Sequence, residues 1–553
     1  MSEETLAGLL ERRAGDDRPG LLFEDRVWSW RDYVGECRDR AARLDARGRG
    51  LHVGVLFDNV PELLFLLGGA ALAGHVIVAL NTTRSPAELA RDADATHVGL
   101  ILHDPAYAGL AAEISTLRRA GPVPDPEPPP GEAAGATAPT VPFPAPEGEA
   151  AAGRPARGEV RGDTLTMLIF TSGTSGRPRA VRITQRKIAV PGVSLGAMLT
   201  PDDVVYCSMP LFHSGAVMAA YAPAVASGAA LALRRRFSAS GLMPDVRRYG
   251  VTYLHYVGKA LSYVLATPAS PGDRDSTLRI AFGNEGSATA TRRFAERFGC
   301  RVIDAFGSTE TAIAITPDPS GPPGCLGRLP EGVEIRHPGT GERCPAAVVE
   351  GGRLLNGDEA IGELVNTRGL GLFDGYYNDP EADRERIREG AFWSGDLAYA
   401  DAEGYVFFAG RGTERLRVDG ENLAVAPIEA VVREFPGVVE AAVYPVPDAA
   451  AGDQVMAALV TADGFDPDAF AAFVSGKDIG PKAVPRYIRI SGELPQTPSH
   501  KVVKRILVAE AWHTADPVWW RPPGETGWRL LTPDDIARID DEFIRHGRAP
   551  LER

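Results

Sequence analysis

Apolar, strand-like segments alternate with helix-like segments through much of the chain, and this pattern limits the fold more than any other feature. Residues 51–57 (LHVGVLF) and 98–103 (VGLILH) are short apolar runs typical of buried strands, and residues 61–73 between them have the length of a helix. Strands buried on both faces and separated by helices are typical of parallel βαβ units. Because the alternation resumes at Leu165 and continues to about residue 306, we predict an α/β fold with doubly wound sheets.

Two changes in composition divide the 553 residues. Residues 121–158 are too rich in proline, alanine and glycine to bury a core, and strand-like segments resume after them, so we predict a flexible excursion within one domain. Beyond residue 351 strand-like segments dominate, and a compact region with its own helix and strands follows. We therefore predict a large N-terminal domain over 1–413, a small mobile α+β domain over 414–513, and a tryptophan-rich tail over 514–553 that folds back on the body.

Charge, cysteine content and the N-terminus exclude several classes of protein. The 73 acidic residues outnumber the 59 basic ones and give a formal net charge of −14, so we expect no nucleic-acid partner. The five cysteines are scattered without C-x-x-C spacing, which favours reduced thiols. The first residues lack the pattern of a signal peptide, and the apolar stretch 63–80 contains His75 and glycines, which favours a buried helix and strand. We expect a cytoplasmic protein without a transmembrane segment.

The apolar run LTMLIF is followed directly by TSGTSGRPR, residues 171–179. Four hydroxyl groups, two glycines and two guanidinium groups in nine residues suit a loop that wraps phosphate oxygens. The segment does not match the mononucleotide pattern G-x-x-x-x-G-K-[ST] or the nucleophile elbow G-x-S-x-G. Considered alone, it predicts a phosphate-binding loop, with an ordinary hydroxyl-rich turn as the alternative.

Further motifs follow this segment in a characteristic order: FGSTET (306–311), GELVNTRG (362–369), GYYNDPEA (375–382), FWSGDL (392–397), GRGTERLRVDGEN (410–422) and LPQTPSHKVVKRIL (494–507). Together they resemble the adenylate-forming superfamily of acyl-CoA synthetases, peptide-synthetase adenylation domains and luciferases, over residues 20 to 510. PLFHSGAV, FGNEGS, LRVDGEN and SHKVVKRIL look most like fatty-acid-transport-protein-type and actinobacterial fatty acyl-CoA synthetases. The resemblance implies ATP, CoA and Mg²⁺ as co-substrates and cofactor, and a carboxylic acid as substrate.

The resemblance also implies roles for residues at the nucleotide. The triphosphate of ATP would be held by Thr171, Ser172, Gly173, Thr174, Ser175, Gly176 and Arg179, the last in place of the usual lysine. Thr309 would contact the α-phosphate, and Glu310 would hold the magnesium ion, a hard oxygen ligand for a hard cation. The ribose hydroxyls would bind Asp396 with help from Arg411, and the adenine would stack on Phe306.

A lysine and a hinge complete the implied machinery. Lys501 would bridge the substrate carboxylate and the α-phosphate, since the family spacing after L-P-x-T favours it over Lys504. The C-terminal domain would rotate about Glu414 between two orientations. In the second orientation, residues at the thioester-forming site would approach CoA: Gly420, Glu421 and Asn422.

The acid pocket of relatives is walled by the helix after PLFH and by the strands that end at FGNEG and AFGST. The equivalent residues here are mostly small or apolar, which favours a lipophilic acid and leaves room for a bulky or polycyclic one, although each could equally be core packing. They are His213, Gly215, Val217, Met218, Ala219, Gly283, Asn284, Gly286, Phe306, Gly307 and Ala312.

Arg179 leaves two functions open beside that of a complete acyl-CoA synthetase. The planar guanidinium group of arginine and the compact ammonium group of lysine bind phosphate with different geometry, so this replacement can change function. One alternative is therefore an enzyme that only forms the thioester from an acyl-adenylate made by a partner enzyme. The other is a non-catalytic sensor of nucleotide or acyl ligands, against which the joint presence of Lys501, Glu310 and Asp396 argues.

Overall fold

The computed structural model describes most of the chain. The described residues are 4–120, 140–142, 160–172, 178–258, 260–286, 288–322, 324–350, 353–411, 415–418, 421–449, 453–462, 464–477, 481–497 and 502–546. Several predicted site residues lie outside these ranges, namely Gly173, Thr174, Ser175, Gly176, Glu414, Gly420 and Lys501. For Ser172, Arg411, Glu421 and Asn422 the structure describes the backbone alone. The predicted excursion 121–158 is described only over residues 140–142.

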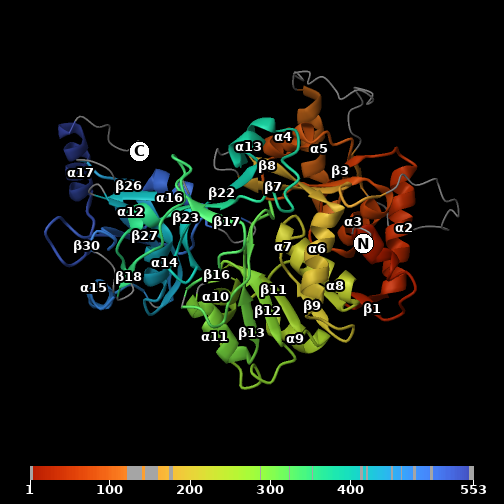
Figure 1. Ribbon diagram of the computed structural model, residues 1–553, viewed down its shortest axis with the longest axis horizontal. Coiled ribbons are helices and arrows are strands. Elements are labelled where there is room, and N and C mark those ends of the chain that lie inside the picture. Colours follow the sequence, from red (N-terminus) through yellow and green to blue (C-terminus); the bar gives the residue numbers. More distant parts are fainter. Residues whose placement is uncertain are drawn as a thin grey trace.

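Two large, mainly parallel sheets form the N-terminal part (Figure 1). The first has the order β13 (Arg301–Asp304), β12 (Ile280–Asn284), β11 (Tyr253–Val257), β9 (Val204–Cys207), β10 (Ala230–Leu233), β1 (Pro19–Phe23), β2 (Arg26–Ser29). The second has the order β6 (Thr140–Pro142), β5 (Leu100–His103), β3 (His52–Leu56), β4 (Val76–Ala79), β7 (Leu165–Ser172), β8 (Pro178–Thr184). The last pair of each sheet is antiparallel. The predicted α/β architecture is confirmed.

Tightly packed helices join these sheets into one core. Two helix pairs have the most extensive contacts: α2 (Trp30–Asp45) with α3 (Pro61–Ala73), and α6 (Gln185–Gly196) with α8 (Ala222–Ser227). A Cβ atom on Gly69 of α3 would lie 2.7 Å from the carbonyl oxygen of Cys37, so only glycine permits this approach. Helix α3 is apolar on all sides, with proline at its start and Gly74 in the left-handed region at its end, which is typical of a buried helix.

The apolar stretch 63–80 forms most of helix α3 and then strand β4, as the sequence predicts. Among the described residues, no helix is both long and apolar enough to cross a membrane.

The other N-terminal helices lie around these sheets. They are α1 (Leu6–Glu11), α4 (Pro86–Ala95), η1 (Pro105–Tyr107), α5 (Ala108–Ala120), α7 (Ser214–Ala216), η2 (Val217–Tyr221), α9 (Leu242–Tyr249), α10 (Ala260–Leu265) and α11 (Ala288–Phe298).

A third, antiparallel sheet follows and carries two of the predicted site residues, Asp396 and Arg411. Its order is β16 (Gly327–Arg328), β23 (Tyr405–Arg411), β22 (Ala391–Ala400), β20 (Gly362–Asn366), β17 (Val333–Arg336), with β21 (Ile387–Arg388) beside β22. Short elements accompany it: β14 (Phe306–Gly307) paired with β15 (Ala314–Ile315), β18 (Val349–Glu350) paired with β19 (Arg353–Leu354), α12 (Gly357–Ala360) and α13 (Pro380–Arg386).

The C-terminal domain, blue in Figure 1, is a five-stranded sheet with helices. The sheet runs β26 (Val438–Pro447), β27 (Asp453–Thr461), β28 (Tyr487–Ile490), β29 (Val518–Trp520), β30 (Arg529–Leu530). The hairpin β24 (Arg415–Val418) and β25 (Glu421–Ala424) precedes it, and α14 (Val425–Arg433), α15 (Pro467–Ser475), α16 (Lys504–Glu510) and α17 (Pro533–Arg545) complete the domain. Residues 514–546 are therefore part of this unit.

Aromatic contacts fix the last strands and helix to the C-terminal domain. Trp528 packs edge-on against Phe470 at 5.3 Å, and Trp512 stacks on Tyr487 at 5.0 Å and contacts Phe543 of α17 at 6.2 Å. Buried aromatic side chains of this kind contribute large apolar areas to a small core. The tail predicted to fold back on the body thus packs on the C-terminal domain itself.

Removing residues 514–553 should destabilise the C-terminal domain strongly. The truncation deletes β29, β30 and α17 and exposes Tyr487 and Trp512, so we expect a loss of more than about 3 kcal/mol in the free energy of unfolding of this domain. Calorimetry would measure the transition, with a chain ending at Arg545 as the control. A melting temperature within about 2 °C of the full chain would contradict this packing.

Candidate active site

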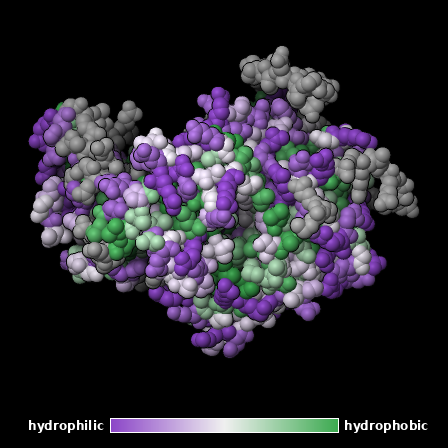
Figure 2. All heavy atoms as spheres, viewed as in Figure 1, coloured by the Kyte–Doolittle hydropathy of each residue, from purple (hydrophilic) through white to green (hydrophobic). Residues whose placement is uncertain are grey.

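A cavity of about 1080 Å³ lies where the N-terminal sheets, the third sheet and the C-terminal domain meet. Its walls include Thr309 and Glu310 after β14, Asp396 on β22, and Gln496 and Thr497 from the C-terminal domain. On the face shown in Figure 2, hydrophobic residues come to the surface over the middle of the molecule, while hydrophilic residues dominate the margins. Apolar side chains such as Ile169, Phe282 and Val302 also line the cavity, which therefore joins polar and apolar surroundings in one space.

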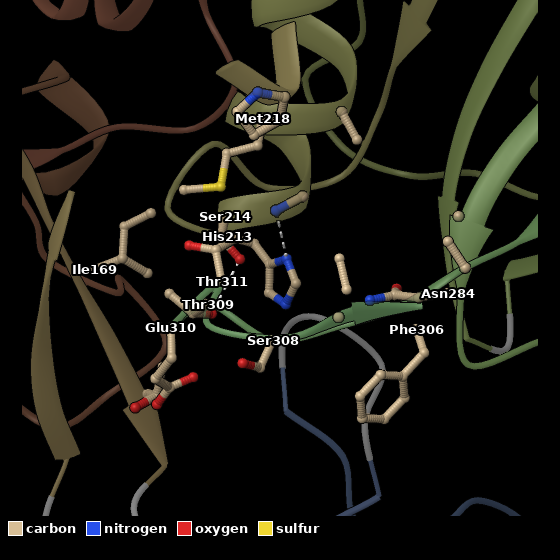
Figure 3. Close-up of a pocket in the computed structure, with 18 of the residues that line it drawn as sticks. Ile169, His213, Ser214, Met218, Asn284, Phe306, Ser308, Thr309, Glu310 and Thr311 are labelled. Carbon is tan, nitrogen blue, oxygen red and sulfur yellow. Dashed lines mark hydrogen bonds between the residues drawn. The ribbon is translucent and has the colours of Figure 1, made fainter. Parts of the chain in front are cut away.

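The turn after β14 directs its polar side chains toward the cavity (Figure 3). The hydroxyl groups of Thr309 and Ser214 lie 3.0 Å apart, and the Tyr376 hydroxyl donates to Glu310 Oε1 at 2.8 Å. Thr311 has φ 53°, a left-handed conformation that is uncommon for a residue with a Cβ atom. A hydroxyl group and an oriented carboxylate thus stand side by side at one end of the cavity.

Arg179 is nearly buried on β8, with 5 % of its surface exposed, and lines the same end of the cavity. Its Nη2 pairs with Glu385, and its guanidinium lies 5.5 Å from the centre of the Tyr376 ring. Its Nη1 is buried and has no hydrogen-bond partner in the described part of the chain. The guanidinium is therefore anchored on one side and has unused donors on the other.

Sequence reasoning missed Lys187, a lysine buried on α6. Its Nζ lies 5.6 Å from the Phe373 ring centre and has no hydrogen-bond partner among the described residues. Burial lowers the pKa of Lys187 to about 8, against the opposing charges of Glu310 and Asp374. A second cation thus lies close enough to the Glu310 carboxylate to interact with its charge. The one signal in the sequence was a lysine next to the apolar run IAV.

Asp396 lies on β22, is 6 % exposed and lines the cavity. In the sheet it pairs with Arg411 of β23, so the backbone register brings the two predicted ribose-binding positions together. Arg386, which the sequence analysis did not single out, also lines the cavity, and a Cβ atom on Gly395 would lie 2.1 Å from its Nη1. Phe306 lines the cavity as well.

The described residues fit a magnesium site only in part. They contain no cluster of three or more His, Cys, Asp or Glu side chains suited to a metal ion. Glu310 offers one oriented carboxylate in the cavity. That arrangement agrees with the usual binding of Mg²⁺ through one or two carboxylates together with substrate phosphates and water.

The apolar end of the cavity lies between α6 and the sheet β11–β12–β13. The predicted residues that line it are His213, Gly215, Met218, Ala219, Gly283, Asn284 and Gly307. Residues that were not predicted also line it, namely Val190 and Leu195 of α6, Met198 just after this helix, and Phe282, Val302 and Ile303 of the sheet. In Figure 3, Met218 and Asn284 reach into the cavity from different sides and His213 stands near its centre.

Three predicted pocket residues have other surroundings. Val217 is fully buried in the hydrophobic core, the backbone N–H of Gly286 donates to Asp304 at 3.0 Å, and Ala312 packs against Gly371. Gly283 does line the cavity, yet a Cβ atom there would lie 2.1 Å from the carbonyl oxygen of Tyr256. This glycine is required by the neighbouring strand, so its small size need not reflect a ligand.

His255 contributes an uncharged polar group to the apolar end. Its Nδ1 contacts the carbonyl oxygen of Phe282 at 3.2 Å, which places the proton on Nδ1, and its Nε2 has no partner in the described ranges. Burial lowers the pKa of His255 to about 4, so the ring is neutral at pH 7.

Family models match both domains. Residues 10–377 match the AMP-binding enzyme family, and residues 427–501 match the AMP-binding enzyme C-terminal domain. The chain belongs to the AMP-binding enzyme family. This confirms the predicted relationship to adenylate-forming enzymes, and the second match falls on the domain that contributes Gln496 and Thr497 to the cavity.

Curated relatives of this AMP-binding enzyme span nearly its whole length. Steroid-22-oyl-CoA synthetase of Rhodococcus jostii (strain RHA1) is 42% identical over 99% of both chains. Medium/long-chain-fatty-acid--CoA ligase FadD17 of Mycobacterium tuberculosis (strain ATCC 25618 / H37Rv) is 47% identical over 91% of this chain and 96% of that protein.

Solved structures share the fold of this AMP-binding enzyme. ATP-bound MatB from Rhodopseudomonas palustris has a TM-score of 0.76 at 24% identity and covers 92% of this chain and 98% of its own. The anthranilate CoA ligase AuaEII in complex with anthranoyl-AMP has a TM-score of 0.77 at 20% identity, and the match covers 93% of this chain and 99% of that one.

Replacing Lys187 with methionine should stabilise the protein at neutral pH. Between pH 8 and pH 10.5 the unfolded chain binds a proton that the native Lys187 has released, so the native protein gains stability as the pH rises through this window. At pH 7 the charged lysine carries the full cost of burial, and we expect Lys187→Met to raise the free energy of unfolding by up to about 3 kcal/mol. The gain should vanish near pH 10.5.

Urea unfolding at pH 7, 8.5 and 10 would measure this difference. Lys477→Met, which removes a surface lysine paired with Glu434, is the control for loss of charge. If Lys187→Met instead lowers stability at pH 7, the lysine forms a net favourable ion pair.

Proposed function

We propose that this AMP-binding enzyme is a complete acyl-CoA synthetase for a bulky, lipophilic carboxylic acid of the steroid type. The observation that carries the proposal is the single cavity of about 1080 Å³, which joins the Thr309, Glu310 and Arg179 end to an apolar end. Its volume is at the upper limit of ordinary ligand sites, which suits a polycyclic acid together with a nucleotide. The 42% identity to a steroid-22-oyl-CoA synthetase over nearly the whole chain supports this substrate class.

The acid would lie with its apolar body between α6 and the sheet β11–β12–β13. This leaves its carboxylate at the polar end, near the hydroxyl groups of Ser214 and Thr309. Asp396 would accept the ribose hydroxyls, and Phe306 would contact the adenine. The Nη1 donors of Arg179 would take a phosphate oxygen, while Tyr376 keeps Glu310 oriented for the metal. Bound Mg²⁺ would neutralise phosphate charge.

The chemistry then proceeds in two steps. A carboxylate oxygen attacks the α-phosphorus, the bond to the β-phosphate oxygen breaks, and pyrophosphate leaves. The thiolate of CoA next attacks the acyl carbon and displaces AMP. Fixed donors near the phosphates stabilise the charge that builds up on them, and Lys501 would add a further cation.

The anchoring of Arg179 supports the complete reaction over a thioester-forming half-enzyme. An unrestrained arginine would lose conformational entropy on binding the phosphates. Glu385 and the Tyr376 ring already hold this guanidinium in place, so less entropy is lost. The arginine can thus take the part of the lysine it replaces. A sensor without catalysis remains less favoured because the cavity also opens to the C-terminal domain.

Pyrophosphate release from ATP by the purified protein tests this function. The panel should hold a steroid 22-carboxylic acid, a long-chain fatty acid, a short hydrophilic acid and an amino acid, with Mg²⁺ present and CoA added or omitted. We expect the steroid acid to give the highest kcat/KM. Faster turnover of short hydrophilic acids would refute the proposed substrate class. Thioester formation from a synthetic acyl-adenylate without any pyrophosphate release would favour the half-enzyme.

Weakening the anchor of Arg179 should affect ATP more than the acyl-adenylate. Glu385 is about half exposed, so its ion pair is partly screened, and we expect Glu385→Gln to raise the KM for ATP about threefold. Thioester formation from a synthetic acyl-adenylate should change little. Glu381→Gln, on the exposed side of the same helix, is the matched control. An equal effect of both variants would exclude a role for the anchor.

A further inference from the structure

A buried carboxylate joins the two domains next to the cavity. Glu440 lies on β26 of the C-terminal domain and is 5 % exposed. The hydroxyl of Tyr263, on α10 of the N-terminal domain, donates to its Oε1. Gln496 donates through Nε2 to both carboxylate oxygens, at 2.9 and 2.8 Å, and to the Tyr263 hydroxyl at 2.8 Å. Helix α10 and strand β26 are in contact at this point.

The same contact adjoins two residues of the C-terminal domain that line the cavity. Gln496 forms an isolated antiparallel bridge with Val502, so these two residues bracket the segment 497–501. Thr497 and Val503, directly beside them, line the cavity. Contacts that fix Gln496 and Glu440 therefore hold Thr497 and Val503 against the cavity.

Two hydrogen-bond partners of Glu440 in this contact come from different domains: Tyr263 belongs to the N-terminal domain and Gln496 to the C-terminal domain. Glu440 and Gln496 would move together if the C-terminal domain rotated, whereas Tyr263 would stay behind. A carboxylate buried at a domain boundary needs donors, and loss of one costs more than loss of an exposed hydrogen bond. Burial and then the Glu440 hydrogen bond raise the pKa of Tyr263, so the phenol keeps the proton that it donates.

We propose that Tyr263 is a positioning residue that, through Glu440, holds the C-terminal domain in the orientation that brings Thr497 and Val503 to the cavity. This inference rests on the proposed two-step function. In that orientation the enzyme forms the acyl-adenylate, and release of Tyr263 from Glu440 accompanies the change to the thioester-forming orientation. The hydrogen bond thereby sets the balance between the two half-reactions.

Tyr263→Phe removes the hydroxyl and keeps the ring, which contacts Phe237 at a centroid distance of 6.5 Å. We expect acid-dependent pyrophosphate release in a single turnover without CoA to slow about tenfold, the effect of losing about 1.4 kcal/mol. Thioester formation from a synthetic acyl-adenylate and CoA should be unchanged or faster. Tyr249→Phe, which removes a surface hydroxyl bonded to the Glu24 carbonyl, is the matched control.

A double-mutant cycle separates positioning from simple loss of structure. Glu440→Gln should act in the same direction as Tyr263→Phe, and the double variant should be no slower in adenylate formation than the worse single variant. Equal slowing of both half-reactions, or additive effects, would overturn the proposal. Failure of the wild type in pyrophosphate release would instead refute the proposed function.

Limited proteolysis needs no turnover, so it separates failure of this inference from failure of the proposed function. The segment 411–417 between the domains contains three arginines, and domain rotation changes how readily trypsin reaches them. We expect Tyr263→Phe to be cut there at a different rate from the wild type and from Tyr249→Phe, with an unchanged melting temperature. Identical cleavage by all three proteins would overturn the inference whether or not the enzyme is active.

Discussion

The hydrogen bond from Tyr376 to Glu310 joins strand β8 of the second N-terminal sheet to the turn after β14, on which the site depends. Tyr376 forms a backbone bridge with Val181 of β8, its ring is covered by Arg179, and its hydroxyl holds the carboxylate that follows β14. Each of these elements alone would leave a polar group at a strand end. Joined through one tyrosine, they place a cation and a carboxylate at fixed positions relative to each other. Such preorganisation is what electrostatic catalysis at a phosphate requires.

Local patterns predicted the fold well because they depend on nearby residues. The apolar runs at 51–57 and 98–103 became β3 and β5, and the proline and glycine that begin and end α3 are visible in the sequence. Strand β29 was not predicted, because three residues become a strand only through pairing with β28. The family motifs supplied Thr309, Glu310 and Asp396, all of which line the cavity.

Partners that are distant in the sequence could not be predicted. Arg179 meets Glu385 across 206 residues and Glu310 meets Tyr376 across 66, and no local pattern encodes these contacts. Lys187 becomes notable only when its burial is known. From the sequence, Gly283 could be interpreted as leaving space for a ligand, but in the structure the Tyr256 backbone of the neighbouring strand occupies that space. The sequence therefore indicates which residue types are available, and tertiary packing decides what each one faces.

Helix α6 presents two different faces. Val190 and Leu195 line the cavity, whereas Gly192 and Gly196 pack against α8, where a Cβ atom on Gly192 would lie 2.8 Å from that of Ala222. Mutations on the glycine face are penalised through folding, while mutations on the other face change mainly the shape offered to the acid. Selection can therefore alter substrate preference along one side of a single helix without losing the scaffold. Related ligases with different acids are expected to diverge first at these cavity-facing positions.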